Sequence, residues 1–209
     1  MKKKELEILL QKVPMAKKPI PTLEQYMTPA PIAADILYTA YHQGDILDKT
    51  VADLGCGTGT FAIGAYLLGA KQSIGIDSDE EIIKSAQTYA QQQGYDVLWH
   101  HLDVNDFQTP CDTIIMNPPF GAQKANRHSD QEFLKVAMNN AAIVYSLHMK
   151  QTLPFLNKFV RQQGGEISWS QPYHFPIKGM FSFHQKLTKD IDVELLRIQV
   201  KKEDTFKKD

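Results

Sequence analysis

Short apolar segments alternate with longer segments of helical spacing through the middle of the chain. The segments that predict strands are 51–54, 73–76, 95–101 and 113–116, and those that predict helices reach to about 68 and cover 80–93. Parallel strands need long crossover connections, which are usually helices, so this alternation is typical of βαβ units. We therefore expect a parallel sheet with helices on both of its faces.

The N-terminal part of the chain has a different pattern. Apolar residues recur at helical spacing over 6–13, and prolines interrupt the chain between 14 and 21. These features predict a helix followed by an extended arm. Thr28 then precedes Pro29 and Pro31, which is the pattern expected at a helix start. We expect this second helix to run to about residue 42.

The C-terminal third of the chain predicts a different end for the sheet. A helix is expected over 130–143, a short strand over 145–148 and a further helix over 153–163. The segments 166–171 and 191–200 have alternating or β-favouring residues, and no helix is required between them. We interpret them as a closing antiparallel hairpin, so the sheet should be mostly parallel with an antiparallel end.

Composition limits the class of protein. With 209 residues, of which 43% are apolar, the chain can bury one sizeable core, and we expect one domain. No apolar stretch approaches the roughly 20 residues that cross a bilayer, and the start lacks the apolar run of a signal peptide, so we expect a soluble, cytoplasmic protein. Only Cys56 and Cys111 are present, and neither has a spacing that suits a disulfide framework or a zinc site.

The charge gives no overall attraction for a polyanion. The formal net charge is -1, so any nucleic-acid binding must use a local patch. Lysines gather near both ends of the chain, at 2–4, 12, 17, 18, 201, 202, 207 and 208. Such clusters are typical of solvated, partly disordered tails, and contact with a nucleic acid is the alternative.

A glycine-rich segment links the first predicted strand to the following helix. From residue 51 it reads Val-Ala-Asp-Leu-Gly-Cys-Gly-Thr-Gly-Thr. Glycines let the backbone turn sharply and let a nucleotide-like ligand approach closely. A dinucleotide site would need glycine where Thr60 stands. The spacing of Gly55, Gly57 and Gly59 instead resembles the Asp/Glu-x-Gly-x-Gly-x-Gly motif of S-adenosylmethionine enzymes.

Two aspartates near this segment suit the same ligand. S-adenosylmethionine carries a sulfonium and an ammonium group, and Asp53 is placed to serve this cationic end directly or through water. Asp77 ends the second predicted strand and suits a carboxylate that accepts both ribose hydroxyls. Taken alone, either residue could instead be a helix cap or a turn aspartate.

The segment Asn117-Pro118-Pro119-Phe120 directly follows the fourth predicted strand, at the edge where open α/β sheets bind ligands. The Asn117 side-chain oxygen and the Pro118 carbonyl could accept both hydrogens of an amino group and direct its lone pair at a methyl donor. Consecutive prolines restrict the backbone and hold these acceptors in place. Phe120 offers a face on which a base could stack. A rigid turn closed by a core phenylalanine is the alternative.

These motifs and four further segments together resemble the methyltransferase-like protein five family. The further segments are Glu-Gln-Tyr-Met-Thr-Pro from residue 24, Asp-Gln-Glu-Phe-Leu-Lys from 130, Val-Tyr-Ser-Leu-His from 144 and Phe-His-Gln-Lys from 183. The resemblance implies adenine-N6 methylation of small-subunit ribosomal RNA by a Rossmann-like class I methyltransferase with a seven-stranded sheet. It also implies a small zinc-binding activator protein as a partner.

We expect three parts in such a chain. An N-terminal helix and arm over 1–28 would close over the cofactor, a methyltransferase domain would cover 29–200, and 201–209 would be a charged tail. This tail extends past the usual end of the family. The segment 95–101 should lie at an edge of the sheet, and Trp99 among apolar neighbours makes it a candidate docking strand for the activator. A covering loop would serve equally well.

The cofactor-binding roles of the family carry over to positions that match its motifs. Gln25 and Thr28 would close over the cofactor, and Asp103 and Val104 would meet the adenine amino group and ring. Asp103 could also be a simple turn aspartate. Thr58 stands where family members have a cysteine. The remaining expected pocket residues are Asp53, Gly55, Gly57, Gly59, Thr60 and Asp77.

Other functions stay open at this point. Glutamine N5 methyltransferases acting on release factors share Asn-Pro-Pro-aromatic, but they usually have tyrosine where Phe120 stands and a separate N-terminal substrate domain. A DNA adenine methyltransferase would need a large target-recognition insertion, for which this chain has no room. The third alternative is a non-catalytic scaffold that binds S-adenosylmethionine or RNA, which would have no need for two convergent acceptors.

Overall fold

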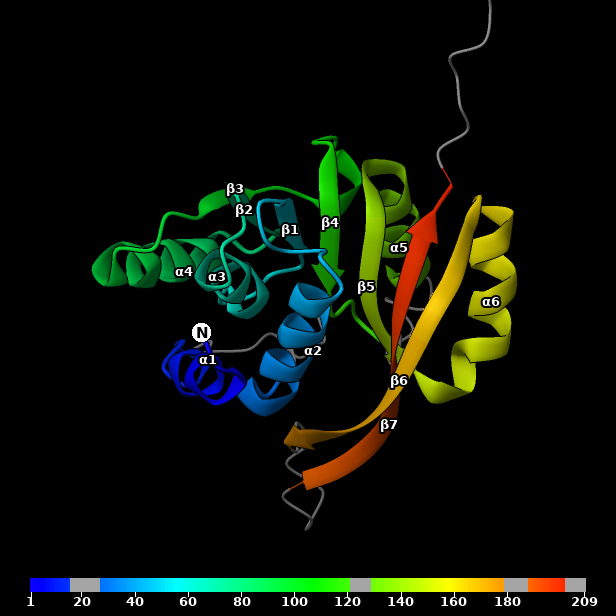
Figure 1. The fold of residues 1–209 in the computed structure, drawn as a ribbon, viewed down its shortest axis with the longest axis horizontal. Coiled ribbons are helices and arrows are strands. Elements are labelled where there is room, and N and C mark those ends of the chain that lie inside the picture. The colour runs from blue at the N-terminus through cyan, green and yellow to red at the C-terminus, as the bar shows by residue number, and fades with distance from the viewer. Residues whose placement is uncertain (16–26, 121–128, 179–187, 202–209) are drawn as a thin grey trace, which may run out of the picture.

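A seven-stranded sheet forms the centre of the structure, a computed structural model that describes residues 1–15, 27–120, 129–178 and 188–201 (Figure 1). The strand order is β3-β2-β1-β4-β5-β7-β6. The strands are β1 (Thr50–Leu54), β2 (Gln72–Asp77), β3 (Leu98–His101), β4 (Cys111–Met116), β5 (Ala141–Met149), β6 (Gly165–Lys178) and β7 (Thr188–Val200). The mixed sheet with an antiparallel end confirms the predicted fold class.

The direction of the strands decides where ligand-binding loops can gather. β3, β2, β1, β4 and β5 are parallel to one another, whereas β7 is antiparallel to both β5 and β6. The carboxyl ends of β1, β2 and β4 therefore meet at one edge of the sheet. The glycine-rich segment, Asp77 and Asn117 follow or end these strands, so the topology alone brings them to the same edge.

Helices cover the sheet on two faces. They are α1 (Lys3–Leu10), α2 (Ala30–His42), α3 (Thr60–Leu67), α4 (Glu80–Gln93), α5 (Ser129–Asn140) and α6 (Leu153–Gln162), with short 3-10 turns η2 (Val104–Asp106) and η4 (Lys150–Thr152). One buried core joins α1, α2 and α3 to the sheet, and a second joins α5 and α6 to it. Alternate residues of β5 enter the two cores, Tyr145 the first and Val144 the second. Within the described residues, no helix has the length and apolar character to span a membrane.

The third strand is shorter than predicted because Tyr95 still belongs to the end of α4. Gly94 adopts a left-handed φ of 71°, and the Tyr95 N–H donates to the Ala90 carbonyl at 2.9 Å. These features close the helix as a Schellman motif, so the chain enters β3 only at Leu98. The predicted position of this strand at an edge of the sheet is confirmed.

The boundary between α5 and β5 also lies earlier than predicted. The Asn140 side-chain nitrogen donates to the carbonyls of Val136 and Phe107, and the next residue, Ala141, already pairs with Cys111 of β4. The helix predicted over 130–143 therefore ends at Asn140. The hairpin strands are longer than predicted, because cross-strand pairs continue without a helix from Gly165 to Lys178 of β6.

The loop after α2 is held in a fixed direction by Gly44 and Asp45. Gly44 has a φ of 77°, and the Asp45 N–H donates to the Ala40 carbonyl at 3.0 Å, as in a Schellman motif. Asp45 is 8% exposed and contacts side chains of three strands, β4, β5 and β7. The end of α2 thus places a carboxylate in a nearly buried position, where it needs partners.

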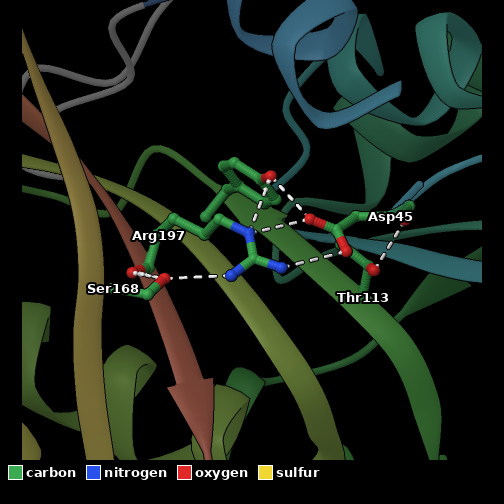
Figure 2. A network of polar contacts seen from close by, with 5 residues as sticks. Asp45, Thr113, Ser168 and Arg197 are labelled. Atoms are coloured by element: carbon green, nitrogen blue, oxygen red, sulfur yellow. Dashed lines mark hydrogen bonds and ion pairs between the residues drawn. The ribbon is translucent and has the colours of Figure 1, made fainter. Parts of the chain in front are cut away.

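Arg197 of β7 supplies the main partner of this carboxylate (Figure 2). Its Nε donates to Asp45 Oδ2 at 2.9 Å and its Nη2 to Asp45 Oδ1 at 3.2 Å. The Tyr145 hydroxyl donates to the same carboxylate at 2.7 Å, and Arg197 Nη1 donates to the Ser168 hydroxyl at 2.9 Å. The Thr113 hydroxyl donates to the backbone carbonyl of Asp45. This network fastens β4, β5, β6 and β7 to the loop after α2.

Candidate functional site

A cavity of about 260 Å³ opens where the carboxyl ends of β1, β2 and β4 meet. The glycine-rich segment, η2, the Asn117 segment and α5 surround it. Its lining residues are Met27, Thr28, Asp53, Gly55, Cys56, Gly57, Thr58, Thr60, Phe61, Ile76, Asp77, Ser78, Ile82, Leu102, Asp103, Val104, Asn105, Asn117, Pro119, Ser129, Glu132 and Phe133. The two motifs that sequence reasoning singled out therefore face one space.

The glycine-rich segment presents bare backbone to this cavity. Gly55, Gly57 and Gly59 all have positive φ, at 68°, 52° and 91°. A Cβ added at Gly57 would meet no atom within 4 Å, so a ligand can approach the backbone there, and one added at Gly55 would come within 3.0 Å of the Phe133 ring. These positions need glycine for their conformation. The open backbone at Gly57 leaves room for a ligand to lie against it.

Asp53 lies at the floor of the cavity and is 2% exposed. Its Oδ2 accepts a hydrogen bond from the Ala62 N–H at 3.0 Å, in the first turn of α3. Burial is the main reason that the pKa of this carboxyl rises to about 8, and the nearby Asp77 raises it further. The Asp53 side chain thus accepts from the first turn of α3 and also lines the cavity, so the two interpretations of this residue are compatible. A cation beside it would favour the ionised form.

Asp77 joins the end of β2 to the glycine-rich segment. Its Oδ2 accepts from the Gly57 N–H at 2.8 Å, and its Oδ1 accepts from the Asp79 N–H at 3.0 Å. Burial raises its pKa, and these backbone donors oppose the rise. The carboxylate therefore holds the loop through Gly57 and also borders the cavity. A group that accepts ribose hydroxyls would need to border the cavity in this way.

Asp103 and Val104 line the cavity at η2. The Asp103 Oδ1 accepts from both the backbone N–H and the side-chain nitrogen of Asn105, at 2.9 Å each. This is the turn chemistry that the sequence left open for Asp103. The turn also brings the aspartate and the following backbone to the cavity wall, so its roles toward an adenine ring stay predictions.

Asn117 emerges from β4 with its side chain toward the arm before α2. Its Nδ2 donates to the Thr28 hydroxyl at 3.1 Å, and no described donor lies within hydrogen-bond distance of its buried Oδ1 atom. Thr28 therefore does not cap α2; Pro29 takes that position, and Thr28 helps to orient Asn117 instead. The amide is held at the cavity wall, with its nitrogen toward the threonine.

Not every predicted residue borders the cavity. Pro118 is buried beside it and Pro119 lines it, while Phe120 is half-buried and packs edge-on against Phe175 of β6, with 6.0 Å between ring centroids and an 86° interplanar angle. Gly59 supports the loop from outside and is not a lining residue. Gln25 and the segment from residue 183 lie outside the described residues.

Sequence reasoning missed a part of the wall that comes from α5 and the arm. Glu132 and Phe133 reach the cavity from α5, and Met27 reaches it from the arm, where the Thr58 hydroxyl lies 3.5 Å from its sulfur. Cys56, within the glycine-rich segment, also lines the cavity, and burial raises the pKa of its thiol. These residues lie within segments quoted for the family resemblance, but no site role was assigned to them, because their contact with the cavity depends on how the elements pack.

Comparisons with known proteins agree with this geometry. The family described as Methyltransferase small domain matches residues 32–143. The zebrafish rRNA N(6)-adenosine-methyltransferase METTL5 is 36% identical over 206 residues, covering 94% of this chain and 98% of its own length. Drosophila melanogaster Mettl5, with the same description, is 34% identical and covers 96% of this chain and 97% of its own.

A solved structure is similar over nearly the whole chain. It is a protein of Pyrococcus horikoshii described as a candidate RNA methyltransferase, and it is 37% identical to this chain. The two superpose with a TM-score of 0.88, covering 96% of this chain and 98% of the other. The similarity thus extends from the glycine-rich segment to the closing hairpin.

Proposed function

This chain belongs to the methyltransferase small domain family, and we propose that it transfers the methyl group of S-adenosylmethionine to the N6 atom of an adenine in RNA. The observation that carries the proposal is the position of Asn117-Pro118-Pro119 on the same cavity as the glycine-rich segment. Near full-length similarity to two rRNA N6-adenosine methyltransferases supports adenine as the acceptor. The established activity of those relatives makes ribosomal RNA the first substrate to test.

The residues of this chain account for the chemistry without a charged base. S-adenosylmethionine supplies an activated methyl group on its sulfonium. Asn117 Oδ1 and the Pro118 carbonyl accept hydrogen bonds from the two amino hydrogens of the adenine, which directs the nitrogen lone pair toward that methyl group. Thr28 orients the Asn117 amide through the contact at 3.1 Å. After transfer, the surplus proton leaves the nitrogen to water.

The remaining residues hold the two reactants. Asp53 and Asp77 serve the cationic end and the ribose of the cofactor, and Gly55, Gly57, Thr58 and Thr60 shape its cradle. Phe120 offers a stacking face to the target base, which must leave any helix to reach the cavity. Asp103 and Val104 meet the adenine of the cofactor.

Three finer statements belong to the same proposal. The RNA is that of the small ribosomal subunit, and the reaction takes place in the cytoplasm, where the free thiols of Cys56 and Cys111 stay reduced. A small zinc-binding activator protein docks on the edge strand β3, whose outer side has no strand beside it among the described residues. Leu98, at 43% exposed, offers apolar surface there.

Transfer of labelled methyl groups tests the function directly. Pure protein is incubated with labelled S-adenosylmethionine and separated ribosomal subunits, and the RNA is digested to nucleosides. Label in N6-methyladenosine from the small subunit is expected. Label in protein instead of RNA would favour a glutamine methyltransferase. Cofactor binding without transfer to any substrate, with or without the activator, would favour a scaffold.

The role of Asn117 has its own test. Asn117→Ala should lower the rate of methyl transfer by about 10²–10³-fold, the usual loss for one such polar contact in a transition state. Its affinity for the cofactor should stay within about twofold, because other residues hold that ligand. The control is Asn157→Ala on the exposed side of α6, where the side-chain amide donates to the Leu153 carbonyl of its own helix. Full activity of Asn117→Ala would exclude the mechanism.

A further inference from the structure

Trp99 has its indole ring turned inward, onto the neighbouring strand. It pairs with Gly75 of β2 in the parallel register of β2 and β3. A Cβ added at Gly75 would lie 2.5 Å from Cζ3 and 2.6 Å from Cε3 of the indole, so glycine is what lets the ring lie flat against β2. The ring is half-buried and packs against the first core.

The same ring continues to the glycine-rich segment. A Cβ added at Gly59 would overlap Cη2 of the indole and lie 2.8 Å from Cζ3. Gly59 has a φ of 91° and is the N-cap of α3, and its N–H donates to the Cys56 carbonyl at 2.8 Å. The benzo part of Trp99 therefore fills the space behind the turn from Cys56 to Gly59.

This turn is the part of the loop that faces the cavity. Thr58 and Thr60, on either side of Gly59, line the cavity, whereas Trp99 does not. The Gly57 N–H is held by Asp77 from the side of β2. The loop is thus fixed by a carboxylate at Gly57 and by an aromatic ring at Gly59, and both of these partners belong to the β2–β3 pair.

We propose that Trp99 is a positioning residue for cofactor binding, which holds the glycine-rich segment in its binding conformation from behind and links it to the edge strand β3. Without the ring, the turn at Gly59 would lose the atoms that lie nearest to it on that side. Each loop residue that must then be ordered on binding weakens the affinity by about tenfold. The inference rests on the proposed function only for the identity of the ligand.

Calorimetric titration with S-adenosylhomocysteine tests the proposal without any methyl transfer. Trp99→Phe keeps an aromatic ring over Gly75 but removes the atoms that reach Gly59, and its dissociation constant should rise about tenfold. Methyl transfer by this variant should show the same rise in KM for S-adenosylmethionine with kcat nearly unchanged. The control is His100→Ala, which removes an exposed side chain from the same strand and should change the affinity less than twofold.

A second glycine provides an independent test. Gly75→Ala adds a methyl group where the ring lies and should weaken binding by displacing it. If the ring is the link, the double variant Gly75→Ala/Trp99→Phe should lose less affinity than the two single losses together. Strict additivity would overturn the link. Melting temperatures without ligand separate the roles, because a residue that only stabilises the fold lowers them and leaves the dissociation constant unchanged.

The chain also carries its own reporter, since it has only two tryptophans. Trp169→Phe leaves Trp99 as the single indole. The fluorescence emission of Trp99 should change as S-adenosylhomocysteine is added, and the titration curve should give the same dissociation constant as calorimetry. An emission that stays constant through saturation would overturn the inference. Wild-type protein that bound no S-adenosylhomocysteine would overturn the proposed function as well, whereas wild-type and Trp99→Phe proteins of equal affinity would overturn this inference alone.

Discussion

Removal of the Arg197 guanidinium should destabilise the protein more than any loss of an exposed ion pair. Arg197→Met keeps most of the aliphatic stem but leaves the Asp45 carboxylate, whose side chain is 10% exposed, with the Tyr145 hydroxyl as its remaining side-chain donor among the described residues. Breaking a buried pair from one side costs about 3–5 kcal/mol. For a chain of this size each kcal/mol lowers the melting temperature by about 2–4 °C, so the expected fall is about 6–20 °C.

Thermal unfolding of four proteins measures this effect. They are wild type, Arg197→Met, Asp45→Asn and the double variant, followed by circular dichroism at one protein concentration. The double variant should lose less than the sum of the single losses, because neither charge is then left alone. The control is Lys84→Met, whose pair with Glu80 is 66% and 58% exposed and contributes about 0.5 kcal/mol or less. An Arg197→Met protein with the same melting temperature as the Lys84→Met protein would refute the reasoning.

Four further predictions concern residues of the site. Asp53 is mostly protonated at neutral pH because its pKa is about 8, and a cationic ligand favours the ionised form. The affinity for S-adenosylmethionine should therefore fall as the pH falls from 8 to 6, by up to about tenfold per pH unit. Calorimetry should show proton release on binding that Asp53→Asn abolishes, and a wild-type affinity that does not change with pH would contradict this. The same raised pKa means that the unliganded fold binds more protons than the unfolded chain, so Asp53 should make it less stable as the pH rises from 4 to 8, which urea unfolding would detect. Phe175→Leu should lower kcat for methylation of RNA about tenfold with the cofactor affinity unchanged, because the edge-on contact with 6.0 Å between ring centroids orients Phe120. A kcat equal to that of the wild type in methyl-transfer assays would exclude this role. Gly57→Ala should lower the free energy of unfolding by about 1–2 kcal/mol because of the φ of 52° at this position. It should also weaken cofactor binding, because the added methyl group occupies the open space beside the backbone. Unchanged binding by calorimetry would show that the ligand does not lie there.

Local patterns were enough to predict the features that depend on one stretch of chain. The glycine-rich turn requires positive φ at Gly55, Gly57 and Gly59, and such a requirement is visible in the residues themselves. Asn117 follows an apolar strand directly, so its place at the carboxyl edge of the sheet was predictable as well. The alternation of strands and helices predicted the parallel part of the sheet, because this pattern is also visible in each local stretch of chain.

Contacts between distant segments could not be predicted in this way. Arg197 and Asp45 are 152 positions apart, and nothing near either residue marks the other. Phe175 meets Phe120 only because the closing hairpin is longer than its apolar pattern indicated. Thr28 has the sequence of a helix cap, yet the arm carries its hydroxyl to Asn117. In each case the packing of whole elements, which local propensity does not contain, selects the partner.

The direction of Trp99 belongs to the same class. Period-two alternation shows that neighbouring side chains of a strand point to opposite faces, but it does not show which face is filled. Two glycines, Gly59 and Gly75, leave the space that the indole occupies. The docking surface that we propose on this strand would therefore use the exposed Leu98 and the strand edge rather than the ring.

The place of β7 in the sheet has a consequence for synthesis on the ribosome. β7 follows β6 in the chain but lies between β5 and β6, and it supplies Leu195, Leu196 and Ile198 to the cores. While a nascent chain has β5 and β6 but not yet β7, the edge of β5 stays unpaired and β6 has no neighbour. An open strand edge is a template for aggregation. Completion of the sheet must therefore wait until about residue 200 has left the exit tunnel, and a chaperone that shields β5 during this interval should raise the yield of folded protein.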